Sequence, residues 1–276
     1  MTNIFNYIDR KSPIHNLTGA TKFVCLLLWS FAAMMTYDTR ILLGLSILSF
    51  ILLGISNIKL KDISFLLWFT ITFMVLNNIL VFLFSPMHGT TLYNTYHEIC
   101  KLWGDNYLTI EQLWYHLNLI LKYFSTMPIV ILFVSTTEPS EFAASLNKIG
   151  VKYTIAYSVS LALRYIPDVQ RDYHEISQAQ QARGIEMSKK ESLFKRLKSA
   201  SAILIPLVLQ SLDRIDIITN AMELRGFGKN KKRTWYRARP FRSLDYISMV
   251  LCALLLCLSI VMNIVNGSRF WIPNFR

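Results

Sequence analysis

Five long apolar stretches constrain this chain more than any other feature. Each carries few charged residues or none, and together they occupy residues 21–35, 41–55, 63–84, 117–134 and 244–265. A helix needs roughly 20 apolar residues to cross the hydrocarbon core of a bilayer. The last three stretches are long enough, and the first two are long enough when their flanks are included. The sequence therefore predicts about five transmembrane helices, in line with a mean hydropathy of +0.36.

Positive charge is concentrated in one part of the chain. Of the 29 Lys and Arg residues, 19 lie between residues 137 and 243, whereas the 36–40 turn, the 85–112 loop and the tail after Gly267 together hold four. Short loops rich in Lys and Arg stay on the cytoplasmic side of a membrane. We therefore expect the N-terminus, the 57–62 turn with Lys59 and Lys61, and the basic segment to be cytoplasmic, and the C-terminus to be outside. A basic segment can also bind nucleic acid, but in a membrane-embedded chain the lipid bilayer and a cytoplasmic partner are favoured, and no nucleic-acid partner is expected.

The chain divides into three parts by composition. Residues 1–135 form a transmembrane block of four helices, residues 136–243 a cytoplasmic module, and residues 244–276 a C-terminal transmembrane helix. The module contains one short helix, ended by Gly150, and two long ones whose apolar residues recur at alternating spacings of four and three. Pro167 and Pro206 fall inside these two patterns and are expected to kink them. The predicted fold is an all-α membrane protein with about five transmembrane helices and three amphipathic helices that are cytoplasmic or interfacial.

Both long amphipathic helices end in the same pattern, Ala-x-x-(Ala/Leu)-Arg-Gly, at residues 179–184 and 221–226. Glycine readily adopts the left-handed conformation that ends a helix, and the planar guanidinium group suits carboxylates or backbone carbonyls. One such end is explained by an arginine that complements the helix dipole. Two copies on similarly built helices instead predict a paired receptor, such as a dimer of ATPase domains. The candidate docking residues are Ala182, Arg183, Gly184, Leu224, Arg225 and Gly226.

Taken together, these motifs resemble the transmembrane T component of energy-coupling factor (ECF) transporters, the membrane coupling subunit of vitamin and metal importers. The resemblance covers nearly the whole chain. Ser12-Pro-Ile-His15-Asn-Leu17-Thr-Gly-Ala-Thr21-Lys22 resembles the opening motif of the family, although Thr18 and Gly19 replace its Asp and Pro. Residues 137–150 resemble the first coupling helix of the family, and Ala162-Leu-Arg164-Tyr-Ile-Pro167 its Leu-Arg-(Phe/Tyr)-x-Pro stretch. Ala221-Met-Glu-Leu-Arg-Gly-Phe-Gly228 resembles its second Arg-Gly end, with Leu224 in place of Ala.

The resemblance implies a four-part assembly in a prokaryotic plasma membrane. Two ABC ATPase subunits bind nucleotide, and Arg183 and Arg225 dock into them. A separate membrane protein, the S component, binds the substrate and lies against the apolar faces of the coupling helices. Its expected contacts are Phe142, Leu146, Ile155, Val159, Leu204, Leu207 and Ile215. The chain itself is then a non-catalytic subunit, since ATP hydrolysis belongs to its partners.

Two other classes of function remain as alternatives. A stand-alone permease needs polar groups inside its own spans, and the sequence offers Asn77, Asn78 and Lys122 there. A membrane-anchored enzyme has less support, because the chain has no phosphate-binding glycine loop and its five histidines lack metal-ligand spacing. We therefore predict no catalytic residue, no cofactor and no metal site.

Overall fold

The computed structural model describes residues 12–93, 95–103, 106–184, 193–229, 235 and 239–271. The chain separates into two compact units. The first combines Met1–Glu138 with Arg239–Arg276, and the second is Pro139–Ala238. The first unit therefore joins the beginning and the end of the chain, and the basic middle of the sequence forms a unit of its own.

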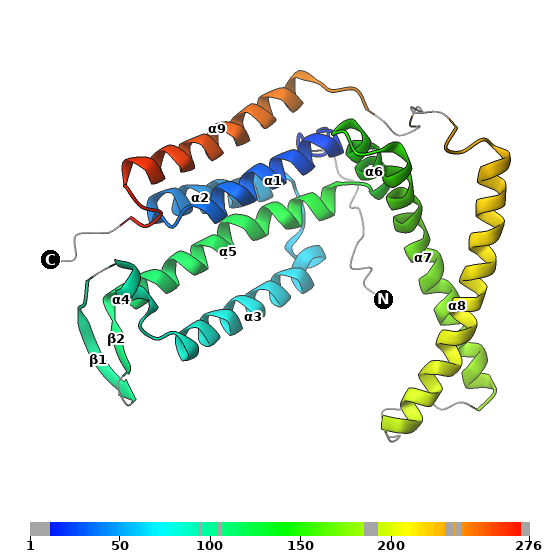
Figure 1. Ribbon diagram of the computed structural model, residues 1–276, viewed down its shortest axis with the longest axis horizontal. Coiled ribbons are helices and arrows are strands. Elements are labelled where there is room, and N and C mark those ends of the chain that lie inside the picture. The colour runs from blue at the N-terminus through cyan, green and yellow to red at the C-terminus, as the bar shows by residue number, and fades with distance from the viewer. Residues whose placement is uncertain are drawn as a thin grey trace. The chain divides into compact units, whose positions relative to one another are not determined.

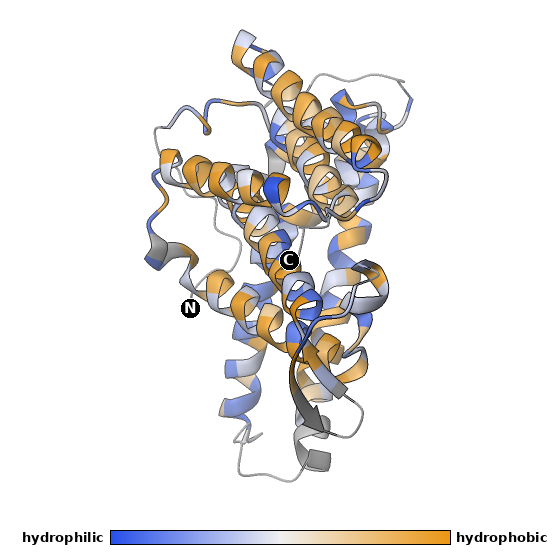
Figure 2. Cartoon of the chain, turned by 90° about the vertical axis from the view of Figure 1, so that its left-hand side faces the viewer, coloured by the Kyte–Doolittle hydropathy of each residue, from blue (hydrophilic) through white to orange (hydrophobic). Residues whose placement is uncertain are grey.

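Among the described residues, five long apolar helices build the first unit (Figure 1). They are α1 (Gly19–Met35), α2 (Thr39–Ile55), α3 (Leu60–Phe84), α5 (Ile110–Thr136) and α9 (Ser243–Val265). Three of them, α3, α5 and α9, are long and apolar enough to cross a membrane, and α1 and α2 are shorter apolar helices. Figure 2 shows hydrophobic residues along the length of these helices. The predicted all-α membrane class is confirmed.

Helix α5 lies at the centre of the first unit. In its apolar 18-residue window 39% of the residues are buried, whereas none is buried in the corresponding window of α3. Helix α2 packs along α5, and α1 packs along α9 and α5. Ser49 donates its hydroxyl to the Phe124 carbonyl (3.0 Å), and the Trp29 indole Nε1 donates to the Ser125 carbonyl (2.9 Å). Small residues let membrane helices approach closely, and interhelical hydrogen bonds then hold them together.

The turn between α1 and α2 binds the segment that follows α9. The Tyr37 N–H donates to the Arg269 carbonyl (2.8 Å), and Asn266 Nδ2 donates to Asp38 Oδ2 (2.8 Å). Arg40 also donates to this carboxylate, at 2.8 Å. Burial opposes ionisation of Asp38, but the hydrogen bonds from Arg40 and Asn266 lower its pKa below the ordinary value. Two of the segments expected outside the membrane thus meet at one end of the helix bundle.

The third such segment, residues 85–112, has more structure than the loop that the sequence suggested. It contains a short helix, α4 (His88–Tyr93), and an antiparallel hairpin of β1 (Glu98–Trp103) and β2 (Asn106–Thr109). The hairpin pairs Glu98 with Thr109 at its base. The Tyr93 ring contacts the Phe270 ring edge-on, with 5.7 Å between centroids, so this segment lies at the same end as the 36–40 turn. The sequence signal for the hairpin was a run rich in aliphatic and aromatic residues interrupted by Gly104-Asp105.

The second unit consists of three helices in its described part. They are α6 (Pro139–Lys148), α7 (Tyr153–Ala182) and α8 (Leu193–Leu224). Gly150, with φ of +107°, ends α6 as predicted, and Pro167 and Pro206 lie inside α7 and α8. Hydrophilic segments interrupt the hydrophobic ones along these helices (Figure 2), which is the amphipathic pattern expected from the sequence.

Candidate functional site

The C-terminal end of α7 has the geometry that the Arg-Gly motif predicts. Ala182 is the last helical residue, and Arg183 follows as the C-cap, with its N–H directed at the Ala179 (3.2 Å) and Gln180 (3.1 Å) carbonyls. Gly184 has φ of +85°, and its N–H donates to the Gln181 carbonyl at 2.9 Å. Nothing lies within 4 Å of where a Cβ on Gly184 would sit. The glycine is therefore required by its backbone conformation and not by lack of space.

The end of α8 repeats this arrangement. Leu224 is the last helical residue, and Gly226 has φ of +66°. The Gly226 N–H donates to the Glu223 carbonyl (2.8 Å) and the Phe227 N–H to the Met222 carbonyl (3.0 Å). These two bonds define a Schellman motif, in which Arg225 takes the C-cap position. At both helix ends the arginine is exposed, beside the last carbonyl groups of its helix.

Helices α7 and α8 run in opposite directions and cross each other (Figure 1), and they are in contact. At one end the Phe227 ring lies 4.9 Å from the Tyr157 ring, and at the other Gln180 Nε2 donates to the Ala202 carbonyl at 3.1 Å. The two Arg-Gly ends are therefore at opposite ends of the helix pair. Helix α7 has 30 residues, so at about 1.5 Å per residue these ends are on the order of 40 Å apart.

An ion pair joins the two helices between these contacts. Arg214 of α8 donates to Asp172 of α7 at 2.7 Å, and its guanidinium carbon lies 6.0 Å from the centroid of the Tyr165 ring. The pair is partly buried, with 12% of the Asp172 side chain exposed. A small cavity of about 240 Å³ lies beside it, and Val169 and Ile215 are among its lining residues. Asp172 and Arg214 thus connect α7 to α8 between the two Arg-Gly ends.

The two ends differ in what surrounds them. Leu224 is 90% exposed, whereas the first end has the small Ala182 at this position. After α8 the Phe227 ring packs against Tyr153 and Tyr157, which lie at the start of α7. The eight residues that follow Gly184 lie outside the described part of the chain. The sequence motif could not reveal the Phe227 contact, because it joins residues about 70 positions apart in the chain.

The residues expected to face a membrane partner fall into three groups. Ile155, Leu204 and Ile215 are each more than half exposed, whereas Leu207 is buried. Phe142, Leu146 and Val159 are half-buried. The structure also exposes a stripe on α8 that was missed, formed by four residues that are each more than half exposed: Ile205, Val208, Leu209 and Leu212. Their i, i+3, i+4, i+7 spacing is the signal that would have found them.

Two of the three polar residues named inside the spans, Asn78 and Lys122, contact neighbouring protein groups. Asn78 Nδ2 donates to the Met74 carbonyl at 2.9 Å, and Asn78 Oδ1 lies 3.0 Å from His116 Nδ1 of α5. The Lys122 ammonium lies 3.2 Å from the centroid of the Tyr37 ring, at the end of the bundle that holds the 36–40 turn. The contact between Asn78 and His116 connects α3 with α5, and in the described part of the first unit neither Asn78 nor Lys122 lines an apolar cavity. The geometry therefore gives no support to a substrate site at these residues.

Comparison with known proteins agrees with these features. Residues 10–236 match the CbiQ family, described as cobalt transport protein. The energy-coupling factor transporter transmembrane protein EcfT of Streptococcus equi subsp. equi is 27% identical, over 90% of this chain and 92% of its own length. The EcfT proteins of Lactococcus lactis subsp. cremoris and Bacillus selenitireducens are 29% and 28% identical, over 91% and 94% of this chain and 95% of their own lengths.

Proposed function

This chain belongs to the CbiQ family of cobalt transport proteins, and from that premise we propose that it is the coupling subunit of an ECF-type importer of a vitamin or another micronutrient. In this role it binds two ABC ATPase subunits in the cytoplasm and a substrate-binding S component in the membrane. It carries motion from the ATPases to the S component and does not itself hydrolyse ATP. Its N-terminus is cytoplasmic and its C-terminus is outside, as the distribution of Lys and Arg favours.

The observation that carries this proposal is the pair of matched helix ends. Arg183 and Arg225 are both exposed C-cap residues followed by a glycine of positive φ. Their placement at opposite ends of an antiparallel pair suits two separate receptors, one on each ATPase subunit. An arginine at this position extends a planar set of donors beyond the helix end, where carboxylates or backbone carbonyls of a groove can accept them.

The S component is proposed to contact the exposed apolar surface of α7 and α8. Ile155, Leu204 and Ile215 belong to this surface, and the α8 stripe that includes Ile205 and Leu209 extends it. Large exposed apolar patches on amphipathic helices mark sites of protein or membrane interaction. Helices α7 and α8 contact each other at both ends and through the Asp172–Arg214 ion pair. A tilt of one helix would therefore move the other and change the surface that the S component contacts.

The proposal is tested by the double substitution Arg183→Ala with Arg225→Ala. Truncating one partner of a buried, hydrogen-bonded charge pair costs about 2–5 kcal/mol in affinity. We therefore expect the variant to lose co-purification with its ATPase subunits and to lose ATP-dependent substrate uptake in reconstituted vesicles. Arg171→Ala is the matched control, because Arg171 is an exposed arginine on α7 whose ion pair with Asp168 is long, at 3.8 Å.

Normal assembly and normal uptake by the double variant would show that these helix ends are not the docking sites. Loss of assembly in the Arg171 control as well would show that the effect is a general loss of positive charge. The substrate is identified separately, from the S component that co-purifies with the wild-type chain.

A further inference from the structure

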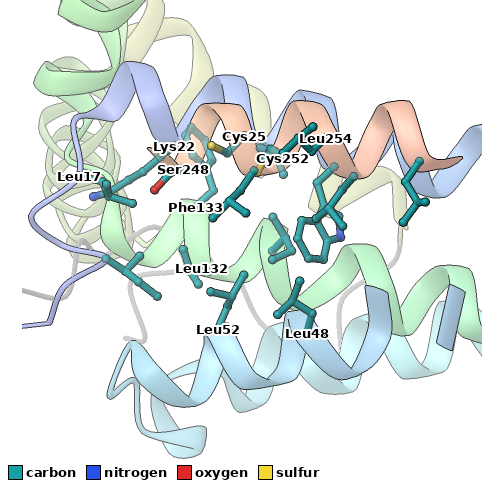
Figure 3. Close-up of a pocket in the computed structure, with 17 residues that line it drawn as sticks. Leu17, Lys22, Cys25, Leu48, Leu52, Leu132, Phe133, Ser248, Cys252 and Leu254 are labelled. Atoms are coloured by element: carbon teal, nitrogen blue, oxygen red, sulfur yellow. The ribbon is translucent and has the colours of Figure 1, made fainter. Parts of the chain in front are cut away.

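Helix α3 lies at the edge of the helix bundle of the first unit. Among the α3 residues whose burial the structure describes, only Ile63 is buried, in a hydrophobic cluster with Met127 and Ile131 of α5. The apolar pocket of about 600 Å³ between α1, α2, α5 and α9 has no lining residue from the described part of α3 (Figure 3). The C-terminal part of α3 can therefore move without opening the centre of the bundle.

A polar network attaches this C-terminal part of α3 to α4 and α5. Asn78 Oδ1 of α3 lies 3.0 Å from His116 Nδ1 of α5, and His116 Nε2 lies 3.1 Å from Gln112 Nε2. Gln112 also accepts the Gly89 N–H of α4 at 2.7 Å and donates to the Ser85 carbonyl at the end of α3 at 3.3 Å. The imidazole ring of His116 thus connects the amide groups of Asn78 and Gln112.

The other hydrogen bonds of these two amides determine which nitrogen of His116 carries the proton. Asn78 Nδ2 donates to the Met74 carbonyl at 2.9 Å, so Oδ1 is the atom that accepts from His116 Nδ1–H. Gln112 Oε1 accepts from Gly89, so the Gln112 NH₂ group faces His116 Nε2, which must be an unprotonated acceptor. The network therefore requires a neutral imidazole with its proton on Nδ1. A proton on Nε2 would face a group that can only donate.

The groups around His116 offer no charge that would favour this second proton. The amide and the phenyl ring that face it from α3 are neutral. Tyr115 is the titratable residue in ring contact with His116, with 6.1 Å between centroids, and His88 of α4 contacts Tyr115. The Glu111 carboxylate is bonded to His97. Among the residues that the structure describes, no charged side chain forms a hydrogen bond or an ion pair with His116.

We propose that His116 is a pH-sensitive switch that fixes the C-terminal part of α3 to α5. Neutral His116 joins Asn78 to Gln112 and holds α3 and α4 in place. When His116 takes up a proton, its Nε2–H group faces the Gln112 NH₂ group and this contact is lost. The C-terminal part of α3 then moves away from α5, while the cluster around Ile63 keeps the other end of α3 attached.

The position of His116 makes this proton accessible. Its side chain is half-buried, and it lies six residues after Ile110, about 9 Å along α5 from the start of the helix. This end of the bundle is the one that we propose to face the outside. An ordinary histidine takes up its second proton near pH 6.5. Acidification of the outer side is therefore expected to release α3.

Pulsed EPR on the full chain, reconstituted in phosphatidylcholine vesicles, tests the switch. The four native cysteines are changed to Ala, and spin labels replace Leu83 of α3 and Leu113 of α5, which are 66% and 47% exposed. The distance distribution should be single at about pH 7.5 and gain a longer component at about pH 5.5, on either side of the ordinary histidine pKa. Labels at Phe65 and Val130, nearer the Ile63 cluster, are the control pair and should show no change.

Substitutions in the network separate its parts. His116→Gln is neutral at both pH values and should abolish the pH response. His116→Lys is charged at both and should show the longer component already at about pH 7.5. Gln112→Glu replaces the NH₂ group with an acceptor of the same shape, so protonated His116 should stay bound and acid should no longer release α3. His97→Gln is the matched control, because His97 contacts Glu111 outside the network, and it should leave the pH response intact.

A distance distribution that is the same at both pH values in the parent chain would overturn the proposal. A pH response that persists in His116→Gln would assign it to another group and would also overturn it. Nitrogen-15 NMR of labelled histidine should show His116 as a neutral imidazole with its proton on Nδ1 at about pH 7.5, and the other tautomer would contradict the network. If His116→Lys fails to fold, as judged by size exclusion, the parent chain and His116→Gln still decide the outcome. None of these measurements depends on the ATPase docking proposed above.

Discussion

The C-terminal ends of α7 and α8 have the same backbone conformation, but different residues surround them. Both place an arginine at the C-cap and a glycine at positive φ, +85° for Gly184 and +66° for Gly226. The end of α8, however, is attached to the start of α7 through Phe227 and carries an exposed Leu224. The repeated motif thus determines how each helix stops, while residues outside the motif determine what a partner meets there. Equivalent arginines can in this way serve two receptors that are not identical.

The largest expected difference between the two ends comes from Phe227→Ala. The substitution removes the ring contacts with Tyr153 and Tyr157 and should cost about 2–3 kcal/mol of local stability, less than for a fully buried Phe. Hydrogen–deuterium exchange should rise at residues 220–229 and stay unchanged at residues 176–184. Phe227→Trp, which keeps a ring, is the control. Equal increases at both ends would show that Phe227 does not distinguish them.

Gly184→Ala and Gly226→Ala test the shared part of the comparison. An L-residue in the left-handed region costs about 1–2 kcal/mol, and an added Cβ meets nothing closer than 3.5 Å at either position. We expect equal losses of stability at the two ends, measured by the same exchange experiment. Asn at either position should be better tolerated than Ala. A much larger loss at one end would contradict the backbone equivalence.

Asp172→Asn should lower the local stability of both Arg-Gly ends by a similar amount. It removes the charge of an ion pair in which 30% of Arg214 and 12% of Asp172 are exposed, and partly exposed pairs contribute about 1 kcal/mol or less. The measurement is the thermal unfolding of the purified chain, combined with exchange at both Arg-Gly ends. The charge-reversed double variant Asp172→Arg with Arg214→Asp should recover most of the loss. A response confined to one end would show that the pair does not link them.

The smallest effect on the isolated chain is expected from Leu224→Ala. The side chain is 90% exposed, so the free energy of unfolding should change by less than about 0.5 kcal/mol. Of the two ATPase subunits proposed as partners, one should bind the variant more weakly, whereas the other should bind as before. The exchanged variant Ala182→Leu with Leu224→Ala should reverse this preference in a pull-down assay. Unchanged affinities would show that neither receptor distinguishes Ala from Leu at the position before the arginine.

The sequence predicted the parts of the structure that depend on local pattern. The last apolar stretch, 244–265, became α9 at Ser243–Val265, because apolar length is sufficient to identify a span. The Arg-Gly helix ends were predicted because glycine readily adopts the left-handed conformation that ends a helix, which is a local property of the chain. Contacts between distant residues were not predicted: the pairing of Asp172 with Arg214, the packing of Phe227 and the 98–109 hairpin all depend on tertiary neighbours. The stripe that contains Val208 was missed because only one face of α8 was followed.

The pairing of α1 with α9 has a consequence for how the protein is made. Ser259 donates to the Ala32 carbonyl at 3.0 Å, and Asp245 accepts from the Thr18 N–H at the start of α1. Helix α1 therefore receives its main neighbour only when α9 is synthesised, after the second unit. Until then the face of α1 that packs against α9 has no protein neighbour in the bilayer. A chain that stops before residue 243 would retain both Arg-Gly ends and still present quality-control proteases with an unfinished bundle.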